Sequence, residues 1–458
     1  VLKMLTISLK SGNTGVSSIA YMGYGMMLSA AFGDYTSGKK LANVAIALNE
    51  QLKYDSLKWK LQLVYHNFVI HWTENIRKSF DTLAEIERET LRNGDHIYLG
   101  YTIGVRLIKK SALGFPLQEL YAEFKGYQKT IDQRVDIETK NIIEPRFQMV
   151  KALCNGEAHA LQNNSFFKGT DFVDSAQRKS SNTVVAEYYI SKLLLCWFSQ
   201  DMEEAIPVLK AAPKYSEYVN MRYEISEYHF YSALLLLRLT ETPLQKQVPR
   251  IKNKINSHLK KLRYWAMHCP DNFEPLWLIA EAENSVFEKQ HEQAAQYYEQ
   301  AIESALRYQY LNYQAIALEL AGEYYLKRKL FKIGQYYLAK AMVSYARWGA
   351  TSKVQQLKHR HHPFLDEASL SLQEMQRSNT LETQSDIRSI IKASEAISTE
   401  IELERLLERL IKTVIENAAA DFGYFLLVQQ HDVRIKAQYV TSHQVKIQDL
   451  EPEPSTIP

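Results

Sequence analysis

Histidines are the most closely grouped side chains of this sequence that could bind a metal. His359, His361 and His362 stand together beside Pro363, and Asp366 follows shortly after. Imidazole and carboxylate groups are typical zinc ligands. No cysteine and no wider set of carboxylates completes a coordination sphere here. We therefore interpret this stretch as an exposed basic linker and predict no metal site.

The cysteines give no second candidate. Cys154, Cys196 and Cys269 lie far apart, so they form neither a disulfide framework nor a CxxC pair. His268 stands beside Cys269, but one such neighbour does not make a site. We expect three reduced, structural thiols, as in a cytoplasmic protein.

Acidic pairs occur, but without the surroundings that catalysis needs. Glu203 with Glu204, and Glu281 with Glu283, lie in helical patterns and are predicted to be solvated charges. Catalytic carboxylates require a cleft that shifts their pKa values. The sequence also lacks a phosphate-binding glycine-rich loop, the kinase H-R-D and D-F-G motifs, and a G-x-S-x-G elbow. We expect no catalytic residue and no cofactor within this segment.

Composition points to helices. The 458 residues are 46% hydrophobic and 23% charged, with a net charge of +3. This weak bias favours neither nucleic acid nor a membrane surface as a partner, and no apolar run is long enough to span a membrane. Glycine (17) and proline (12), which destabilise helix interiors, are both scarce.

Repeated helix pairs are the strongest pattern. One pair begins at Glu274, breaks at 288–291, and carries Ala294, Tyr298 and Ala301 on one stripe of its second helix. In the next pair, the polar break between the helices lies at 327–329. Its small and large apolar residues have a similar arrangement. These positions are Ala321, Gly322, Gly334, Leu338 and Ala341. The pattern resembles the tetratricopeptide repeat, with a step of about 40 residues in place of about 34.

Fainter pairs fill the rest of this region. One unit joins Gly33 to a helix with Ala42 and Ala45, and another joins 193–198 to Ala205 and Leu209. Further helices are predicted at 56–93, 96–134, 136–154 and 222–268. Residues 155–181 are predicted to form a long loop and to mark a seam between two halves of the array.

Stacked helix pairs bury a continuous core and leave a concave surface. Four tyrosine doublets fit such an array, since one ring of each could face the core and the other the groove. The doublets are 188–189, 297–298, 324–325 and 336–337. We expect most of these rings to be packing residues.

The pattern changes after Trp348, and the polar stretch that follows is predicted to end the repeats. A linker is expected at 366–382, and a helix from Thr383 to about Ile397. Thr399 and Glu402 then form a capping box ahead of a second helix. That helix carries an amphipathic stripe of Leu403, Leu406, Leu407, Leu410, Ile411 and Val414.

Two strands are predicted beyond these helices, at 422–428 and 433–439, joined by a turn at 430–432. An isolated hairpin is marginally stable in water. We therefore expect sequence outside this segment to complete the sheet, and we read the chain as a fragment of a longer polypeptide.

The stretches 390–398, 406–410, 415–420 and 423–427 resemble the entry to a GAF domain. A helical region followed by a GAF domain is a domain order that resembles large bacterial multi-sensor kinases. That resemblance implies a serine/threonine kinase-like domain, an AAA-type ATPase, helical repeats, a GAF domain and a histidine kinase. The implied fold is mostly α: a tetratricopeptide-like α-α superhelix at 1–365, followed by a truncated α/β, GAF-like segment at 383–458.

The resemblance implies a non-catalytic regulatory and protein-interaction segment of a signalling kinase. The array would bind a protein partner or a neighbouring domain, and helices 384–397 and 401–415 would form a dimer. One alternative is the inducer-sensing region of an ATPase-coupled transcription activator. Another is a free-standing helical scaffold.

Overall fold

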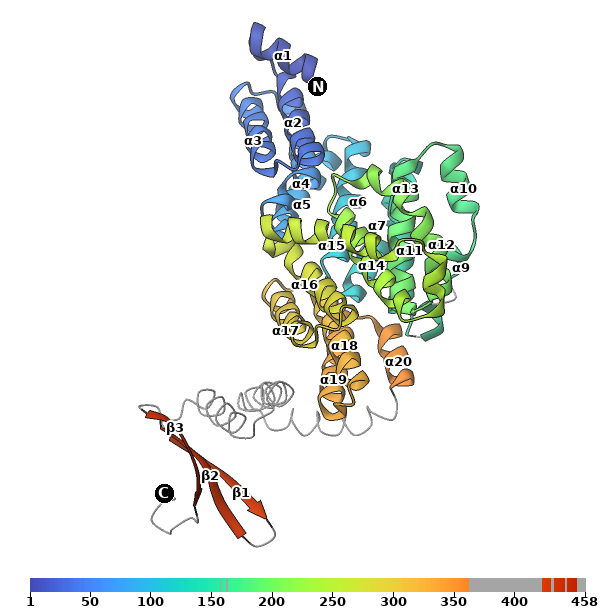
Figure 1. Ribbon diagram of the computed structural model, residues 1–458. Coiled ribbons are helices and arrows are strands. Elements are labelled where there is room, and N and C mark those ends of the chain that lie inside the picture. Colours follow the sequence, from blue (N-terminus) through green and yellow to red (C-terminus); the bar gives the residue numbers. More distant parts are fainter. Residues whose placement is uncertain (157, 162–163, 362–421, 430–431, 441–442, 451–458) are drawn as a thin grey trace. The chain divides into compact units, whose positions relative to one another are not determined.

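The computed structural model describes the chain as two compact units, Val1–Leu365 and Asp366–Pro458 (Figure 1). The described residues are 1–156, 158–161, 164–361, 422–429, 432–440 and 443–450. The predicted linker at 366–382 and the two predicted helices at 384–397 and 401–415 lie outside them. The chain is mostly helical, as predicted.

Helices make up nearly all of the first unit. Its first half contains α1 (Leu2–Ser11), α2 (Ser17–Met27), η1 (Leu28–Phe32), α3 (Tyr35–Gln51), α4 (Asp55–Phe68), η2 (Ile70–Trp72), η3 (Ile76–Lys78), α5 (Ser79–Arg92), α6 (His96–Ala112), α7 (Leu117–Arg134) and α8 (Ile137–Cys154).

The second half begins with shorter pieces and continues in long helices. It contains η4 (Ala158–Leu161), α9 (Ser165–Lys168), α10 (Asp171–Arg178), α11 (Asn182–Ser199), α12 (Met202–Ala211), α13 (Pro213–Ser216), η5 (Glu217–Val219), α14 (Glu224–Thr240), η6 (Pro243–Gln247), α15 (Ile251–His268), α16 (Pro270–Phe287), α17 (His291–Arg307), α18 (Leu311–Lys327), α19 (Phe331–Trp348) and α20 (Thr351–Arg360).

The two most regular helix pairs, α16–α17 and α18–α19, correspond to the two clearest helix pairs predicted from the sequence. Ala294, Tyr298 and Ala301 are all buried, as the stripe indicated. In the next pair, a Cβ added at Gly322 would lie 2.8 Å from the Leu338 side chain. A larger residue at Gly322 would therefore push α19 away from α18.

The turns of these pairs share one geometry that the sequence did not reveal. Lys289, Gln309 and Lys329 adopt left-handed φ angles of 61°, 63° and 62°. The next backbone N–H then donates to a carbonyl in the last turn of the helix, for example Tyr310 to Ala305 at 2.8 Å. This is the Schellman arrangement, which usually employs glycine.

The second half of the first unit folds back beside the first half. Trp265 of α15 donates to the Tyr35 hydroxyl at 2.8 Å, and Thr351 of α20 donates to the Cys154 carbonyl at 2.9 Å. The partners in these two contacts are separated by 230 and 197 residues. In Figure 1, α15 and α16 accordingly lie beside α4 and α5.

This return fills the surface that an open array would leave exposed. Helices α11, α14 and α18 are buried around almost their whole circumference. A helix lining an open groove would instead keep one polar, solvated face. These helices therefore lie in the interior of the unit, where α11 packs between α8 of the first half and α14 of the second.

Three expectations need correction. Residues 155–181 contain the short helices η4, α9 and α10 rather than one long loop. The polar stretch after Trp348 is itself helical: it forms α20, which packs against the first half through Ser352, whose hydroxyl donates to the Ala152 carbonyl at 2.8 Å. Tyr324 and Tyr325 are both buried, whereas the other three doublets each pair a buried ring with a partly exposed one.

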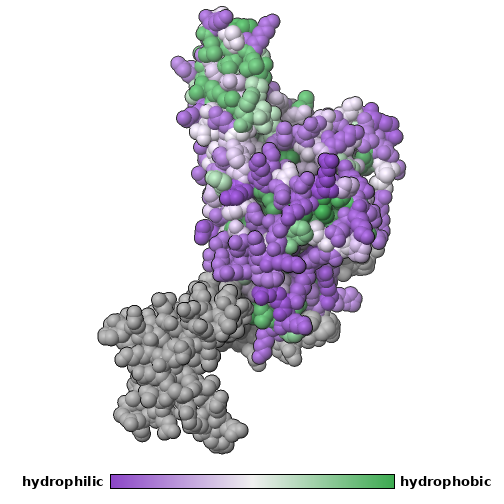
Figure 2. All heavy atoms as spheres, in the orientation of Figure 1, coloured by the Kyte–Doolittle hydropathy of each residue, from purple (hydrophilic) through white to green (hydrophobic). Residues whose placement is uncertain are grey.

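The N-terminal helices differ from the rest of the visible surface. Figure 2 shows apolar residues gathered on α1–α3, while the face below is mainly hydrophilic. Exposed apolar residues there include Leu2, Ile7, Leu9, Phe32 and Val44. No helix among the described residues is long and apolar enough to cross a membrane.

The described part of the second unit is a three-stranded antiparallel sheet in the order β1-β2-β3. Its strands are β1 (Phe422–Gln429), β2 (Asp432–Val440) and β3 (His443–Leu450). The two predicted strands correspond to β1 and β2, and the register is irregular between Phe425 and Leu426. The expectation of only two strands was wrong, because β3 pairs along β2.

Candidate ligand-binding pocket

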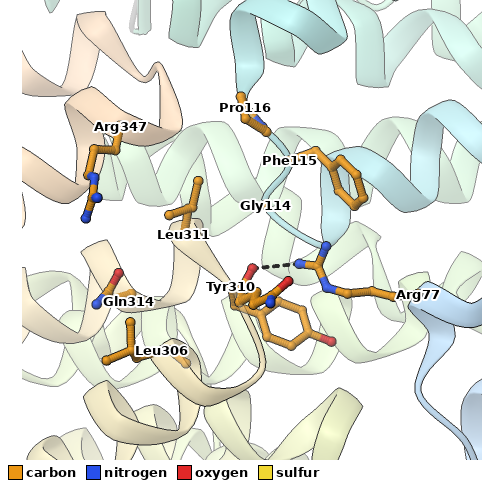
Figure 3. Close-up of a pocket in the computed structure, with 11 residues that line it drawn as sticks. Arg77, Gly114, Phe115, Pro116, Leu306, Tyr310, Leu311, Gln314 and Arg347 are labelled. Atoms are coloured by element: carbon orange, nitrogen blue, oxygen red, sulfur yellow. Dashed lines mark hydrogen bonds between the residues drawn. The ribbon is translucent and has the colours of Figure 1, made fainter.

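A hollow of about 620 Å³ opens on the first unit where its two halves meet (Figure 3). Its walls come from η3, from the turn between α6 and α7, from the turn between α17 and α18, and from α19. This volume is typical of ligand pockets in proteins. Two arginines and no acidic residue belong to its lining.

Arg77 of η3 reaches between the two turns. Its guanidinium donates to the Leu113 carbonyl at 2.8 Å and to the Gln309 carbonyl at 2.6 Å. It also lies 4.9 Å from the centroid of the Phe115 ring and 5.4 Å from that of Tyr310. Such contacts use the guanidinium as a hydrogen-bond donor and as a cation over aromatic faces.

Arg77 has no carboxylate partner in the described part of the chain. Its Nε is buried and lacks an acceptor. Burial lowers the pKa of the Arg77 guanidinium below its ordinary value, and only tyrosines oppose this effect. A partly buried cation without a counterion destabilises the folded chain. An anion bound beside Arg77 would therefore be stabilising.

Asn272 fixes the segment that carries Arg77. From the first turn of α16, its Oδ1 accepts from the Ile76 N–H at 3.0 Å, and its Nδ2 donates to the His71 and Glu74 carbonyls, both at 2.7 Å. One fully buried amide thus satisfies three backbone groups in the segment that contains η2 and η3. The backbone that leads into Arg77 is therefore fixed by α16.

The turn between α6 and α7, next to Arg77, is fixed in a similar way. Gly114 has φ +69°, and a Cβ there would lie 2.3 Å from Oδ1 of Asn312. The Nδ2 of Asn312 donates to the Ala112 carbonyl at 3.1 Å. The left-handed turn and the close approach both require glycine, and together they make the rim of the pocket rigid.

The remaining lining combines an exposed cation with apolar surface. Arg347 of α19 is exposed and approaches the hollow from the side opposite Arg77 in the view of Figure 3. Leu306 is 63% exposed at the wall, and Pro116 and Leu311 extend the apolar surface. This arrangement can bind an anion beside an apolar group; it offers no nucleophile and no general base.

None of the residues singled out from the sequence lies in this pocket. His359 is exposed on α20 and His361 follows that helix, with its Nε2 4.0 Å from Glu323. The side chain of His361 is only 12% exposed, so the expectation of an exposed linker fails for it. His362 and Asp366 lie outside the described residues. In the part that is described, no group of three or more histidines, cysteines or acids could hold a metal.

The acidic pairs behave differently from one another. Glu203 is exposed, and Glu204 pairs with Lys192, in agreement with solvated charges. Glu283 is an exception: burial raises its pKa, and it accepts a hydrogen bond from the Tyr298 hydroxyl. Its partner in sequence, Glu281, accepts from the Trp277 indole at 3.1 Å.

All three cysteines are free thiols. Burial raises the pKa of Cys154 to about 11, and those of Cys196 and Cys269 to about 12. Thiols with such pKa values are poor nucleophiles. His268 is exposed and contacts the Tyr264 carbonyl rather than the Cys269 thiol.

A buried charge centre lies in the middle of the first unit, where α8, α11 and α14 meet. Arg146 is fully buried and donates to both oxygens of Glu227, at 2.9 and 2.7 Å. Glu187 lies 3.8 Å from the same guanidinium and 3.3 Å from Arg222. Burial and the nearby Glu224 raise the pKa of Glu187 to about 7, against the opposing effect of Arg146.

A second buried cluster holds α20. Lys353 pairs with Glu319 at 2.8 Å, and both side chains are almost fully buried. Glu323 pairs with Arg238 at 2.7 Å and with Arg360 at 3.0 Å. Burial alone would raise the pKa of Glu323, but these arginines hold it well below its ordinary value.

Comparisons with known proteins find one distant relative and leave the family open. A stretch of 157 residues is 26% identical to hybrid signal transduction histidine kinase G of Dictyostelium discoideum. That stretch is 34% of this chain and 4% of the relative, so the match spans a small part of the relative's length. No family model and no solved structure matches the chain.

Proposed function

We propose that this chain is a non-catalytic regulatory and protein-interaction segment of a multidomain signal-transduction kinase. The observation that carries the proposal is the stretch of 157 residues shared with a hybrid histidine kinase. The repeated helix pairs support it, since such arrays typically present surfaces to other proteins.

The finer parts of the proposal rest on the resemblance to known families. The helix pairs α16–α17 and α18–α19 would be extended, irregular tetratricopeptide-like units. The strands β1–β3 would open a GAF-type sensor domain, preceded by dimerising helices at 384–397 and 401–415. The segment would act in the cytoplasm, and phosphotransfer would belong to other parts of the parent polypeptide.

The test uses the whole polypeptide that contains this segment. Its autophosphorylation from labelled ATP is compared with that of a variant that lacks residues 1–360. We expect both to be stable and the deletion to change the rate several-fold, while the segment 1–458 alone transfers no phosphate.

Two results would reject the proposal. One is a parent polypeptide without phosphotransfer activity. The other is an equal rate with and without the array. A DNA-binding helix-turn-helix in the parent would instead favour the inducer-sensing role in a transcription activator.

A further inference from the structure

We propose that the pocket between η3, α17–α18 and α19 binds an acidic peptide segment of a partner protein, with one carboxylate at Arg77, a second at Arg347 and a neighbouring apolar side chain on Leu306 and Pro116. This inference deepens the proposed interaction function by naming the chemistry of the partner.

The positive charges of the pocket are not balanced within it. Two arginines face one hollow whose lining contains no acidic residue. Elsewhere in the described part of the first unit, buried arginines meet carboxylates directly, as Arg146 meets Glu227 at 2.7 Å and Arg238 meets Glu323 at 2.7 Å. A charged N–H donor forms a strong hydrogen bond with a carboxylate. Since Nη2 of Arg77 already donates to two carbonyls, its Nη1 is the group that a bound carboxylate would meet.

Hydrogen bonds fix the walls of the pocket. Arg77 holds the Leu113 and Gln309 carbonyls, while Asn272 and Asn312 hold the backbone on either side. A pocket whose polar groups are fixed before binding loses little entropy when a ligand arrives. The site is therefore preorganised for one class of ligand.

The pocket is open at its rim, which favours a peptide over a small acid as its ligand. Arg347 and Leu306 stand exposed at the rim, so a small molecule in the hollow would keep much of its surface in water. Small-ligand pockets usually bury most of the ligand. A peptide can place one carboxylate inside and continue over the rim, where apolar contacts add affinity.

The experiment titrates the purified 1–458 chain into a fluorescein-labelled peptide with the core Asp-Leu-Asp-Leu and follows fluorescence anisotropy. Matched peptides carry Asn-Leu-Asn-Leu or Asp-Ser-Asp-Ser. We expect the first peptide to bind at least about tenfold more tightly than either control, and its affinity to fall as salt rises.

Variants locate the binding. Arg347→Glu should weaken binding about tenfold or more without disturbing the fold, because no described residue hydrogen-bonds to this exposed side chain. Arg77→Gln should do the same, with circular dichroism as the check on folding. Arg263→Gln removes an exposed arginine of α15 outside the pocket, and we expect it to bind like the wild type.

Several outcomes would overturn the inference. These are equal binding of the acidic and amide peptides, unchanged binding by Arg347→Glu, or glutarate binding as tightly as the peptide, which would assign the site to small acids. Such failures leave the proposed function standing if deletion of the array still changes autophosphorylation of the parent.

Discussion

Arg146 and Arg77 stand in opposite surroundings within the same unit. Arg146 is enclosed by α8, α11 and α14 and donates to both oxygens of Glu227. Arg77 lies at the edge of a hollow and donates to two backbone carbonyls instead. The first arrangement satisfies its charge internally, whereas the second leaves a cation for an external anion. Burial of a charge therefore indicates a structural role only when its counterion is buried with it.

Removing Arg146 should have the largest effect. Arg146→Met leaves Glu227 buried without its cation, and we expect the free energy of unfolding to fall by about 3–5 kcal/mol. Urea unfolding of the 1–458 chain, followed by circular dichroism, measures this. The double change Arg146→Met with Glu227→Leu should recover part of the loss. A loss below about 1 kcal/mol for the single variant would contradict a structural role for the pair.

The charge centre should also respond to pH. The pKa of Glu187 is raised from 4.5 to about 7 in the folded chain. Its protonated form is favoured by folding, so its contribution is complete below pH 4.5 and is lost as pH rises through about 7. Relative to Glu187→Gln, the wild type should lose up to about 3 kcal/mol between these limits. Parallel curves for the two proteins would show that Glu187 does not titrate in this range.

Arg77 should matter less for stability. Arg77→Met removes two hydrogen bonds to carbonyls but leaves no carboxylate unpaired among the described residues, so we expect a loss of about 1–2 kcal/mol. The same urea titration compares it directly with Arg146→Met. A loss as large as that of Arg146→Met would mean that Arg77 is a structural residue first.

Arg347 should be the most tolerant of these positions. Arg347→Gln changes an exposed side chain, and we expect the free energy of unfolding to stay within about 0.5 kcal/mol of the wild type. Thermal unfolding checks this. A clear destabilisation would point to a structural contact at the rim of the pocket and would remove the contrast with Arg146.

The local sequence pattern was sufficient to predict the two clearest helix pairs. The breaks at 288–291 and 327–329 coincide with the turns between α16 and α17 and between α18 and α19, because polar residues interrupt the apolar spacing there. The alternation at 433–439 likewise placed β2. The third strand was missed, since the apolar alternation in His443–Leu450 covers only Val445 and Ile447, and the strand forms by pairing with β2.

The pocket could not have been found in this way. Arg77 lies in a short stretch between helices, and nothing nearby in sequence distinguishes it from other surface arginines. Its importance comes from carbonyls and an amide that belong to distant residues, including Gln309, which is 232 residues away. Glu283 was misjudged for a similar reason, because its burial depends on the neighbouring helix that carries Tyr298.

The sequence by itself determined the two clearest helix pairs, their apolar faces and the breaks within them, since these follow from short-range spacing. The tertiary structure alone decided that the second half returns beside the first, that α11, α14 and α18 lie in the interior, and that Arg77 and Arg347 line one hollow. The physical reason is that contacts between residues 196–232 positions apart depend on the packing of whole helices, and no local pattern records which distant surface will complete a buried charge.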